Sequence, residues 1–293
     1  MTRRRLRSVA PPLPRPLLDD VNVVVTGTGP HTLVLLHGFS DNLLTWRRVV
    51  PALAVEHRVV AIDLPGHGAT LRAWGAPLLE GYADIAAEVL DRLEVNVPVS
   101  LMGNSMGAAV SAVFATRYPQ RVDALALIGM PGVSGVPLTW RAAASRPASI
   151  AMRTALRPIP LQHLQRGFGW AYSHAASPRA RSIDPAALRS YCDSYPDRDR
   201  LFALSNIARA LLGELRALHL DRVLPALPAP VLQVWGKHDR LVPPRHVTRG
   251  AGVVVLPGCG HCPQLDAPDL LLDTVLPFLA AGRDVSLPRA AGT

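Results

Sequence analysis

The hydrophobic pattern of the first half of the chain alternates between two kinds of segment. Short apolar runs have the length and the β-branched content of strands, and longer stretches between them repeat apolar residues every three or four positions, as helices do. Most of the short runs are continuously apolar, which is typical of strands buried on both faces of a parallel sheet covered by helices. The pattern predicts strands over residues 21–26, 32–36, 59–62, 97–102 and 122–128.

Helical spacing is clearest in three segments that alternate with these strands. Residues 43–54, 82–93 and 108–118 carry it, and the last of them stops before Pro119. The same alternation of strand and helix resumes near the C-terminus. It predicts strands over residues 231–235 and 253–256 and a helix over residues 268–280.

A long middle segment breaks this alternation. Residues 131–225 are rich in alanine, arginine, leucine and proline and place aromatic residues at helix-like intervals, without strand-like runs. We therefore expect one α/β core, made of residues 21–130 and 226–282, with a helical cap or lid inserted at residues 131–225. Residues 1–20 are predicted to form a disordered basic tail, and residues 283–293 a loose C-terminal tail.

The charge of the chain is positive and unevenly distributed. The 31 basic and 22 acidic residues give a net charge of +9, and 30 of the basic residues are arginines, with Lys237 as the exception. Most of the excess lies in residues 131–225 and in the N-terminal tail. A basic face can attract an anionic substrate, a membrane surface or a nucleic acid. Because acidic residues and prolines interrupt the arginine clusters, we expect no nucleic-acid partner and only a weak contact with an anionic membrane surface.

Composition excludes several classes of protein. The chain is 49% hydrophobic, which is enough for a packed core, and it has no run of the ~18 uncharged apolar residues that a membrane-spanning helix needs. Three cysteines in 293 residues do not describe a disulfide scaffold. The arginine-rich start is not followed by the apolar segment of a secretory signal, so we expect a cytoplasmic protein. The oligomeric state is not predicted.

A serine lies where one predicted strand turns into a helix. Gly103-Asn-Ser-Met-Gly107 directly follows the strand over residues 97–102 and precedes the helix over residues 108–118. Glycines on both sides allow the tight turn that lifts the Ser105 hydroxyl above the sheet. This nucleophile elbow predicts that Ser105 is a catalytic nucleophile, and an ordinary strand-to-helix turn is the alternative.

Two residues further along the chain can activate this serine, which needs a base and a third group that orients the base. Asp239 follows the strand over residues 231–235, and His261 follows the strand over residues 253–256. Both therefore lie at the carboxyl edge of the sheet, where Ser105 lies and where open α/β sheets bind ligands. We predict a catalytic triad of Ser105, Asp239 and His261. The alternatives are Asp239 as a helix cap and His261 as a loop histidine.

An oxyanion hole must stabilise the negative charge of a tetrahedral intermediate. We expect one donor to be the backbone N–H of Met106, just after the serine. The other is the N–H of Phe39, in the loop after the strand over residues 32–36. The side chain of His37 is expected to brace that loop. This chemistry requires neither a metal ion nor an organic cofactor.

Together these motifs resemble the α/β-hydrolase superfamily, and the resemblance covers nearly the whole chain. It implies the α/β-hydrolase fold, a mostly parallel sheet flanked by helices, whose second strand runs antiparallel. It also implies a helical lid after the sixth strand. The motifs that stand in the family's order are His37-Gly-Phe39, Asp63-Leu-Pro-Gly-His-Gly68, residues 103–107, residues 236–243 and Gly258-Cys-Gly-His261.

The favoured function is that of a serine esterase that acts through an acyl-enzyme on a small molecule, either lipid-like or with a small apolar acyl group. Trp140, Phe168 and Trp170 of the cap are expected to bind this substrate. One alternative is a carbon–carbon bond hydrolase of ring-fission diketones, whose elbow resembles this one, although Cys262 stands where those enzymes usually carry tryptophan. The others are a cofactor-free peroxidase or oxygenase, and a ligand receptor or interaction protein on a hydrolase scaffold.

Overall fold

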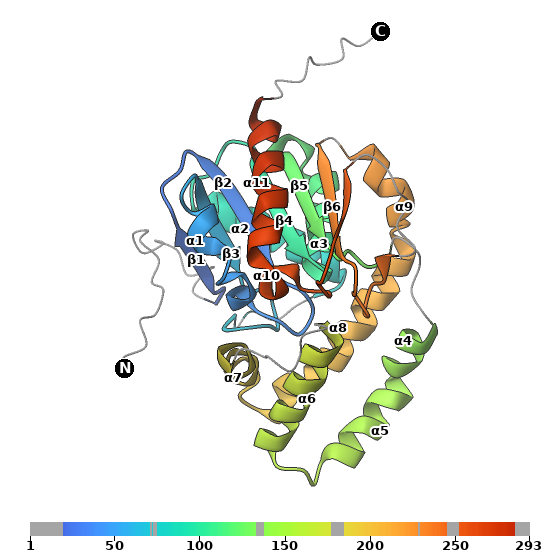
Figure 1. Ribbon diagram of the computed structural model, residues 1–293. Helices are drawn as coiled ribbons and strands as arrows, with labels where there is room; N and C mark the ends of the chain where they lie inside the picture. Colours follow the sequence, from blue (N-terminus) through green and yellow to red (C-terminus); the bar gives the residue numbers. More distant parts are fainter. Residues whose placement is uncertain are drawn as a thin grey trace.

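A computed structural model of the chain describes residues 20–70, 72, 75–132, 138–176, 185–227, 229–244 and 252–284. The two predicted tails lie almost entirely outside these residues. One sheet forms the centre of the molecule, with helices on both of its faces, and a further group of helices projects beyond one edge of the sheet (Figure 1).

The strands of the described residues form a single seven-stranded sheet. They are β1 (Val23–Thr26), β2 (His31–Leu36), β3 (His57–Ile62), β4 (Val99–Asn104), β5 (Val122–Ile128), β6 (Val231–Gly236) and β7 (Val253–Leu256). Their order is β1-β3-β2-β4-β5-β6-β7, with β1 antiparallel to β3 and all other neighbours parallel. The predicted α/β fold with a mostly parallel sheet is therefore confirmed.

The position of the antiparallel strand differs from what the resemblance implies. In the described residues the antiparallel strand is the first, β1, rather than the second, and the long helical segment follows the fifth strand, β5, rather than the sixth. Strand numbers counted from β1 are therefore one lower than those that the resemblance implies. The order of the elements around the predicted site is unaffected, because all of these elements follow β1.

Helices cover both faces of the sheet. Figure 1 shows α11 in front of the sheet, and the residues of α2 and α3 belong to the apolar cluster on the opposite face. The covering helices are α1 (Val50–Leu53), α2 (Leu78–Arg92), α3 (Met106–Arg117) and α11 (Pro268–Asp284). No helix in the described part of the chain has both the length and the apolar character that crossing a membrane would take.

Successive residues of β2 face the two opposite layers of helices. Leu33 and Leu35 pack in the cluster that includes α1 and α11, whereas Val34 and Leu36 pack in the cluster that includes α2 and α3. All four side chains are fully buried. Side chains alternate along a strand, so a strand that is covered on both sides must be apolar at every position. This explains the continuous apolar runs of the sequence.

The single helix predicted over residues 43–54 is wrong. The chain instead forms a one-turn 3-10 helix, Leu43–Trp46, and then the short helix α1. Pro51 lies in the first turn of α1. Proline has no N–H and clashes with the preceding turn, so Pro51 favours the first turn of a new helix over the interior of one helix through residues 43–54.

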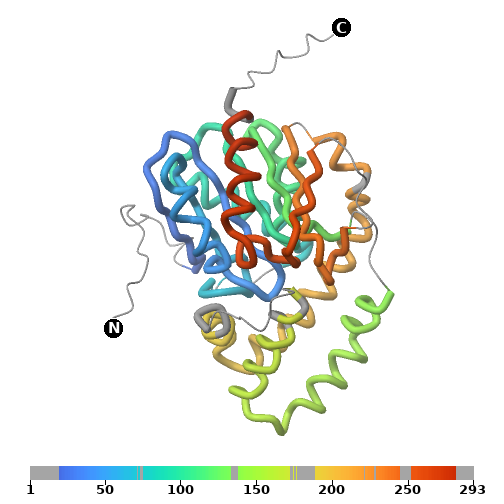
Figure 2. The backbone as a smooth tube through the Cα atoms, in the orientation of Figure 1, coloured from blue at the N-terminus to red at the C-terminus, as the bar shows by residue number. Residues whose placement is uncertain are grey.

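The chain leaves the sheet after β5 and returns to it at β6, and Figure 2 traces the helical path between them. We call residues 138–223 of this path the helical insertion. It lies within the segment for which the cap was predicted. Its helices are α4 (Leu138–Ala143), α5 (Arg146–Leu156), α6 (Leu161–Ala176), α7 (Pro185–Ser194), α8 (Arg198–Ala217) and α9 (Leu220–Val223).

Helix α8 is attached to the core near both of its ends. The Arg200 guanidinium donates hydrogen bonds to the carbonyls of Gly68 and Thr70, at 2.8 and 2.7 Å. The Glu214 carboxylate accepts the backbone N–H groups of the first two residues of α2, at 2.6 and 2.8 Å. A carboxylate at a helix N-terminus satisfies amides that have no partner within the helix. These bonds fix α8 over the carboxyl edge of the sheet.

Candidate active site

Ser105 occupies a strained turn between β4 and α3. Its φ of 53° and ψ of −115° lie in a backbone region that residues other than glycine rarely adopt. The flanking glycines allow the chain to make this turn. A Cβ at Gly103 would lie 2.3 Å from the carbonyl oxygen of Gly107, and a Cβ at Gly107 would lie 2.1 Å from that of Leu36. The backbone therefore has the geometry expected of a nucleophile elbow.

Asp239 and His261 form a buried hydrogen-bonded pair. Their side chains are 0% and 3% exposed, and the Nδ1 atom of His261 lies 2.7 Å from Oδ2 of Asp239. The other carboxylate oxygen accepts the N–H groups of Leu241 and Val242, at 2.9 and 2.7 Å. A carboxylate that accepts from Nδ1 places the ring proton there, so Nε2 is left to accept a proton from another group.

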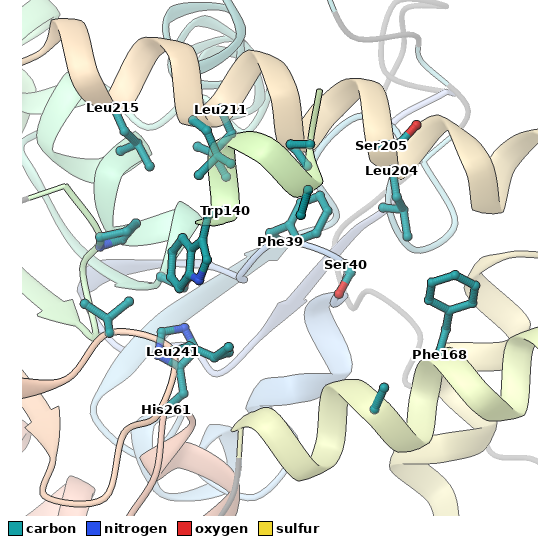
Figure 3. A pocket seen from close by; sticks show the side chains of 18 of the residues that line it. Phe39, Ser40, Trp140, Phe168, Leu204, Ser205, Leu211, Leu215, Leu241 and His261 are labelled. Carbon is teal, nitrogen blue, oxygen red and sulfur yellow. The ribbon is translucent and has the colours of Figure 1, made fainter. Parts of the chain in front are cut away.

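Ser105 and His261 line the same cavity, which has a volume of about 430 Å³. The cavity lies between the carboxyl edge of the sheet and the helical insertion, and α8 contributes a large part of its wall. Figure 3 shows His261, Leu241 and Trp140 toward one end of the cavity, with Phe168 and Leu204 toward the other. The structure thus pairs Asp239 with His261 and brings Ser105 to the same cavity wall as the histidine.

Both predicted oxyanion donors belong to segments next to Ser105. Met106 is the first residue of α3 and directly follows the serine. Phe39 lines the cavity, and its loop passes close to the elbow, because a Cβ at Gly38 would lie 3.3 Å from the Cβ of Ser105. The N-terminus of α3 adds the positive end of a helix dipole at this point.

His37 is held inside the loop that carries Phe39. Its Nδ1 atom donates to the carbonyl oxygen of Gly38 at 2.8 Å, and its Nε2 atom accepts the N–H of Leu64 at 3.0 Å. Both ring nitrogens are therefore occupied. Complete burial lowers the pKa of His37 from its ordinary 6.5 to about 4, so the ring is neutral near pH 7. These contacts fit the predicted bracing role.

Asn104 is a site residue that the sequence analysis missed. It is fully buried, and its Nδ2 atom donates to the backbone carbonyl of His261 at 2.9 Å. Its Oδ1 atom lies 3.7 Å from the thiol sulfur of Cys262. The amide thereby links the nucleophile elbow to the loop that carries the histidine. The available signal was its place directly before Ser105, where a buried polar side chain needs partners.

Gly129 is a second residue that the sequence analysis missed. It follows β5 with a φ of 55°, and a Cβ at this position would lie 3.0 Å from Nδ1 of His261 and 3.4 Å from Oδ2 of Asp239. The Asp–His pair therefore needs a glycine here. A glycine immediately after a strand that ends at the same sheet edge was the signal in the sequence.

The three predicted substrate-binding residues do not all face the cavity. Trp140 and Phe168 line it, but Trp170 is 58% exposed and does not line it; its ring centroid lies 3.9 Å from that of His174. Trp170 follows Phe168 by two residues, which is about 200° around a helix, so the two side chains leave α6 on opposite sides. The expectation for Trp170 is corrected accordingly.

Cys259 and Cys262 form no disulfide and are buried within the loop that carries His261. The described part of the chain contains no group of three or more histidine, cysteine or acidic side chains that could hold a metal ion. Several polar residues line the cavity. They are Ser40, Ser105, Tyr191, Ser205 and His261.

Comparison with known families identifies the one to which this chain belongs. A family model described as "alpha/beta hydrolase fold" matches residues 31–268, which is most of the chain. The chain belongs to the α/β-hydrolase family. It is 22% identical to a thermophilic esterase from Thermogutta terrifontis, with a TM-score of 0.70, covering 89% of this chain and 93% of that one. That likeness concerns the fold.

Curated relatives of this hydrolase carry several different names. A dihydrolipoyllysine-residue acetyltransferase component of an acetoin cleaving system from Pseudomonas putida is 34% identical over 86% of the chain, which spans 64% of that protein's length. A 2-hydroxy-6-oxononadienedioate/2-hydroxy-6-oxononatrienedioate hydrolase from Cupriavidus pinatubonensis is 28% identical, covering 87% of this chain and 88% of its own. A pimeloyl-[acyl-carrier protein] methyl ester esterase from Edwardsiella ictaluri is 27% identical, covering 88% and 96%.

Proposed function

We propose that this hydrolase cleaves carboxylic esters with an apolar acyl group, through an acyl-enzyme on Ser105. One observation carries the proposal: Ser105 and His261 share the wall of an apolar cavity, and a buried carboxylate holds the far side of the imidazole. We refer to Ser105, His261 and Asp239 as the proposed catalytic trio. A hydroxyl, a base and an orienting acid are what nucleophilic acyl transfer requires.

In the proposed mechanism, Nε2 of His261 takes the Ser105 proton while Oγ attacks the ester carbonyl carbon. The oxyanion receives hydrogen bonds from the N–H groups of Phe39 and Met106, and each such donor is worth roughly 10²–10³ in rate. His261 then gives its proton to the departing alkoxide, and an acyl-enzyme remains. Water attacks this intermediate by the same route. Asp239 keeps the imidazole oriented and stabilises its charged form.

The lining of the cavity supports an uncharged substrate. None of the described residues that form it is an arginine, lysine, aspartate or glutamate. A substrate carboxylate would be taken out of water there without a cationic partner, which costs several kcal/mol. The idea that arginines of the cap hold such a carboxylate receives no support from the described lining. A hydrocarbon chain fits this wall, because its burial is favourable.

This argument favours an ester over a dicarboxylate diketone. The name of the Cupriavidus relative describes a dioate, which carries two carboxylates, and the name of the Edwardsiella relative describes a methyl ester. No charged side chain in the described part of the cavity wall would pair with these carboxylates. An ester of an apolar acyl chain leaves only its carbonyl group to be satisfied, and the proposed oxyanion donors serve that group.

The test is a substrate series. We expect the purified protein to hydrolyse p-nitrophenyl esters, with kcat/KM rising as the acyl chain lengthens until it fills the cavity. Vinylogous diketone dicarboxylates should react far more slowly. In the Ser105→Ala variant kcat should fall by roughly 10⁴-fold or more, with the unfolding midpoint retained. Faster cleavage of the diketone, or esterase activity that survives in Ser105→Ala, would overturn the proposal.

A further inference from the structure

The first three helices of the insertion carry an unbalanced charge. Residues 138–176, which comprise α4, α5 and α6, contain five arginines and no aspartate or glutamate. We call this segment the α4–α6 arm. All five arginine side chains are exposed. With no carboxylate in the same segment to neutralise them, they make the arm a positive surface.

The α4–α6 arm also exposes large apolar side chains. Leu138 is 73% exposed, Ile150 65% and Trp170 58%, and Ile159, between α5 and α6, is 36% exposed. Large exposed apolar side chains in one small segment indicate an interaction surface, whereas single ones are ordinary. The rest of the described chain, although much longer, exposes only four others, Leu44, Val55, Val97 and Val255.

The basic and apolar side chains share helix faces. Arg146 and Ile150 of α5 are four residues apart, and Arg157, the C-cap residue of the same helix, follows Ile150 by seven, which places the three within about 40° around the helix axis. On α6, Arg166 and Trp170 are four residues apart and both are exposed. Each helix thus presents arginine beside an apolar side chain.

The other faces of the same helices line the cavity. Trp140 of α4, Met152 of α5 and Phe168 of α6 belong to its wall. Figure 1 shows α5 and α6 projecting away from the sheet, so the core does not cover their outer surfaces. The arm therefore lies between the candidate active site and whatever its outer surface contacts.

We propose that the outer surface of the α4–α6 arm binds an anionic lipid bilayer, and that apolar esters enter the cavity from that membrane. Arginine near an anionic leaflet contributes about 1 kcal/mol per residue, and tryptophan with aliphatic side chains is favourable at the headgroup level. A nucleic acid would be attracted by the charge alone and would gain little from Leu138 or Ile150. An apolar substrate that dissolves in lipid is what the cavity lining accommodates.

Binding is measured by flotation of the full-length protein with vesicles, without any turnover. We expect the protein to float with vesicles of equal parts phosphatidylglycerol and phosphatidylcholine, and to remain behind with pure phosphatidylcholine. Binding should weaken as salt is added, because screening shortens the reach of the charges. No binding to the anionic vesicles would overturn the proposal, as would capture by an acidic soluble protein in place of the vesicles.

The deciding variant is Arg146→Glu with Arg157→Glu, and its matched control is Arg216→Glu with Arg222→Glu. Both lower the net charge by four, but Arg216 and Arg222 lie at the end of α8 and in α9, outside the arm. We expect the first pair to weaken vesicle binding by at least about tenfold and the control to change it little. Equal losses of vesicle binding in both double variants would mean that the vesicles attract the net charge of the whole protein rather than the arm, and would overturn the proposal.

Folding of the deciding variant can be checked independently. Arg146 is the first residue of α5, where a helix dipole disfavours a cation and favours glutamate, so its replacement does not weaken the helix. Hydrolysis of a soluble short-chain p-nitrophenyl ester, with vesicles absent, should match the unsubstituted protein. If no variant and not even the unsubstituted protein hydrolyses the ester, the proposed function is contradicted. Vesicle binding is measured by flotation without turnover, so its result does not depend on that activity.

A variant with an unchanged net charge completes the test. Ile150→Ser with Trp170→Ala leaves the charge unchanged and removes the two apolar side chains that flank the arginines. We expect it to bind anionic vesicles several-fold more weakly and to lose the blue shift of tryptophan emission that insertion of Trp170 produces. Full retention of both binding and blue shift would contradict insertion of the arm into the bilayer.

Discussion

The structure contains a second group of serine, histidine and aspartate, and it lies at the opposite edge of the sheet from the proposed catalytic trio. Ser100 is near the start of β4, whereas Ser105 follows the end of the same strand. The Ser100 hydroxyl donates to Asp123 at 2.7 Å, and Nε2 of His31 lies 3.0 Å from that hydroxyl and 3.1 Å from Asp123. Three identical residue types are therefore arranged twice.

The difference between the two groups lies in connectivity and access. At the second group the carboxylate accepts the hydrogen bond of the serine hydroxyl directly, so the hydroxyl hydrogen does not point at the histidine. Ser100 lies within β4 and is only 1% exposed. At the proposed catalytic trio the carboxylate binds the far nitrogen of the imidazole, and the serine lines a cavity. Residue identity alone thus does not predict a nucleophile, and the proposal for Ser105 rests on the order of contacts and on the strained elbow.

The largest expected contrast comes from the two carboxylates. Asp239→Asn should lower kcat for ester hydrolysis by about 10⁴-fold, because an amide no longer selects the imidazole tautomer that leaves Nε2 free. Asp123→Asn should leave kcat nearly unchanged and lower the free energy of unfolding by about 1 kcal/mol. Steady-state kinetics and urea unfolding of both variants check this. Comparable losses of kcat in the two would remove the distinction between the groups.

A smaller contrast concerns two glycines with positive φ. Gly129→Ala should lower kcat by about 10²-fold, because the new methyl group would meet the His261 ring at 3.0 Å and displace it. Gly132, with a φ of 91°, is the matched control, since the nearest atoms to a Cβ there belong to the side chains of Leu220, at 3.1 Å, and Leu215, at 3.4 Å, rather than to His261. Gly132→Ala should cost about 1–2 kcal/mol of stability and leave kcat alone.

Equal kinetic effects in the two glycine variants would show that positive φ, rather than contact with His261, determines the loss. Thermal unfolding of both variants supplies the control. If the two variants are destabilised equally but differ in kcat, the difference in kcat comes from the contact of the new methyl group with His261. Activity at a temperature well below both unfolding midpoints is the measurement to compare.

The smallest effect concerns a buried histidine that takes no part in proton transfer. The pKa of His37 is about 4 in the folded protein and 6.5 when unperturbed, so as pH falls below 6.5 the unfolded chain binds the proton first. Stability should therefore fall with decreasing pH, by up to about 1.4 kcal/mol per pH unit from this residue. In His37→Gln the slope of unfolding free energy against pH, between pH 6.5 and 4, should be shallower by that amount.

An unchanged slope in His37→Gln would mean that His37 is already charged in the folded protein. That outcome would also undo its assignment as a neutral brace, because a protonated Nε2 cannot accept the N–H of Leu64. Burial, together with the neighbouring His37, lowers the pKa of His67 to about 3, so His67 contributes a slope of the same sign, and comparing the two proteins in a His67→Gln background removes that contribution.

The sheet, and the position of Ser105, Asp239 and His261 at one of its edges, could be predicted because both leave strong local signals. A strand covered on both sides is apolar along most of its length, and β5, which is apolar after Asp123, was predicted with its observed bounds. Ser105, Asp239 and His261 each follow a strand that was predicted, and parallel strands bring their carboxyl ends to one edge. By contrast, the break between the 3-10 helix at Leu43 and α1 accompanies Pro51, and apolar periodicity alone does not record it.

The missed features depend on contacts between distant segments. The role of Asn104 follows from a bond to the backbone of His261, 157 residues away, and no residue type encodes a carbonyl partner. Trp170 was assigned to the site because aromatic residues are frequent in pockets, but its helical phase relative to Phe168 placed it outside. The resemblance between the groups of Ser105 and Ser100 likewise emerges only when the sheet is assembled.

The most direct test of the account is labelling with a fluorophosphonate, followed by mass spectrometry of the digested protein. The account predicts one adduct on Ser105, none on Ser100, and labelling that is greatly slowed in Asp239→Asn but normal in Asp123→Asn. An adduct on another residue, or labelling of Ser105 that does not depend on Asp239, would contradict it.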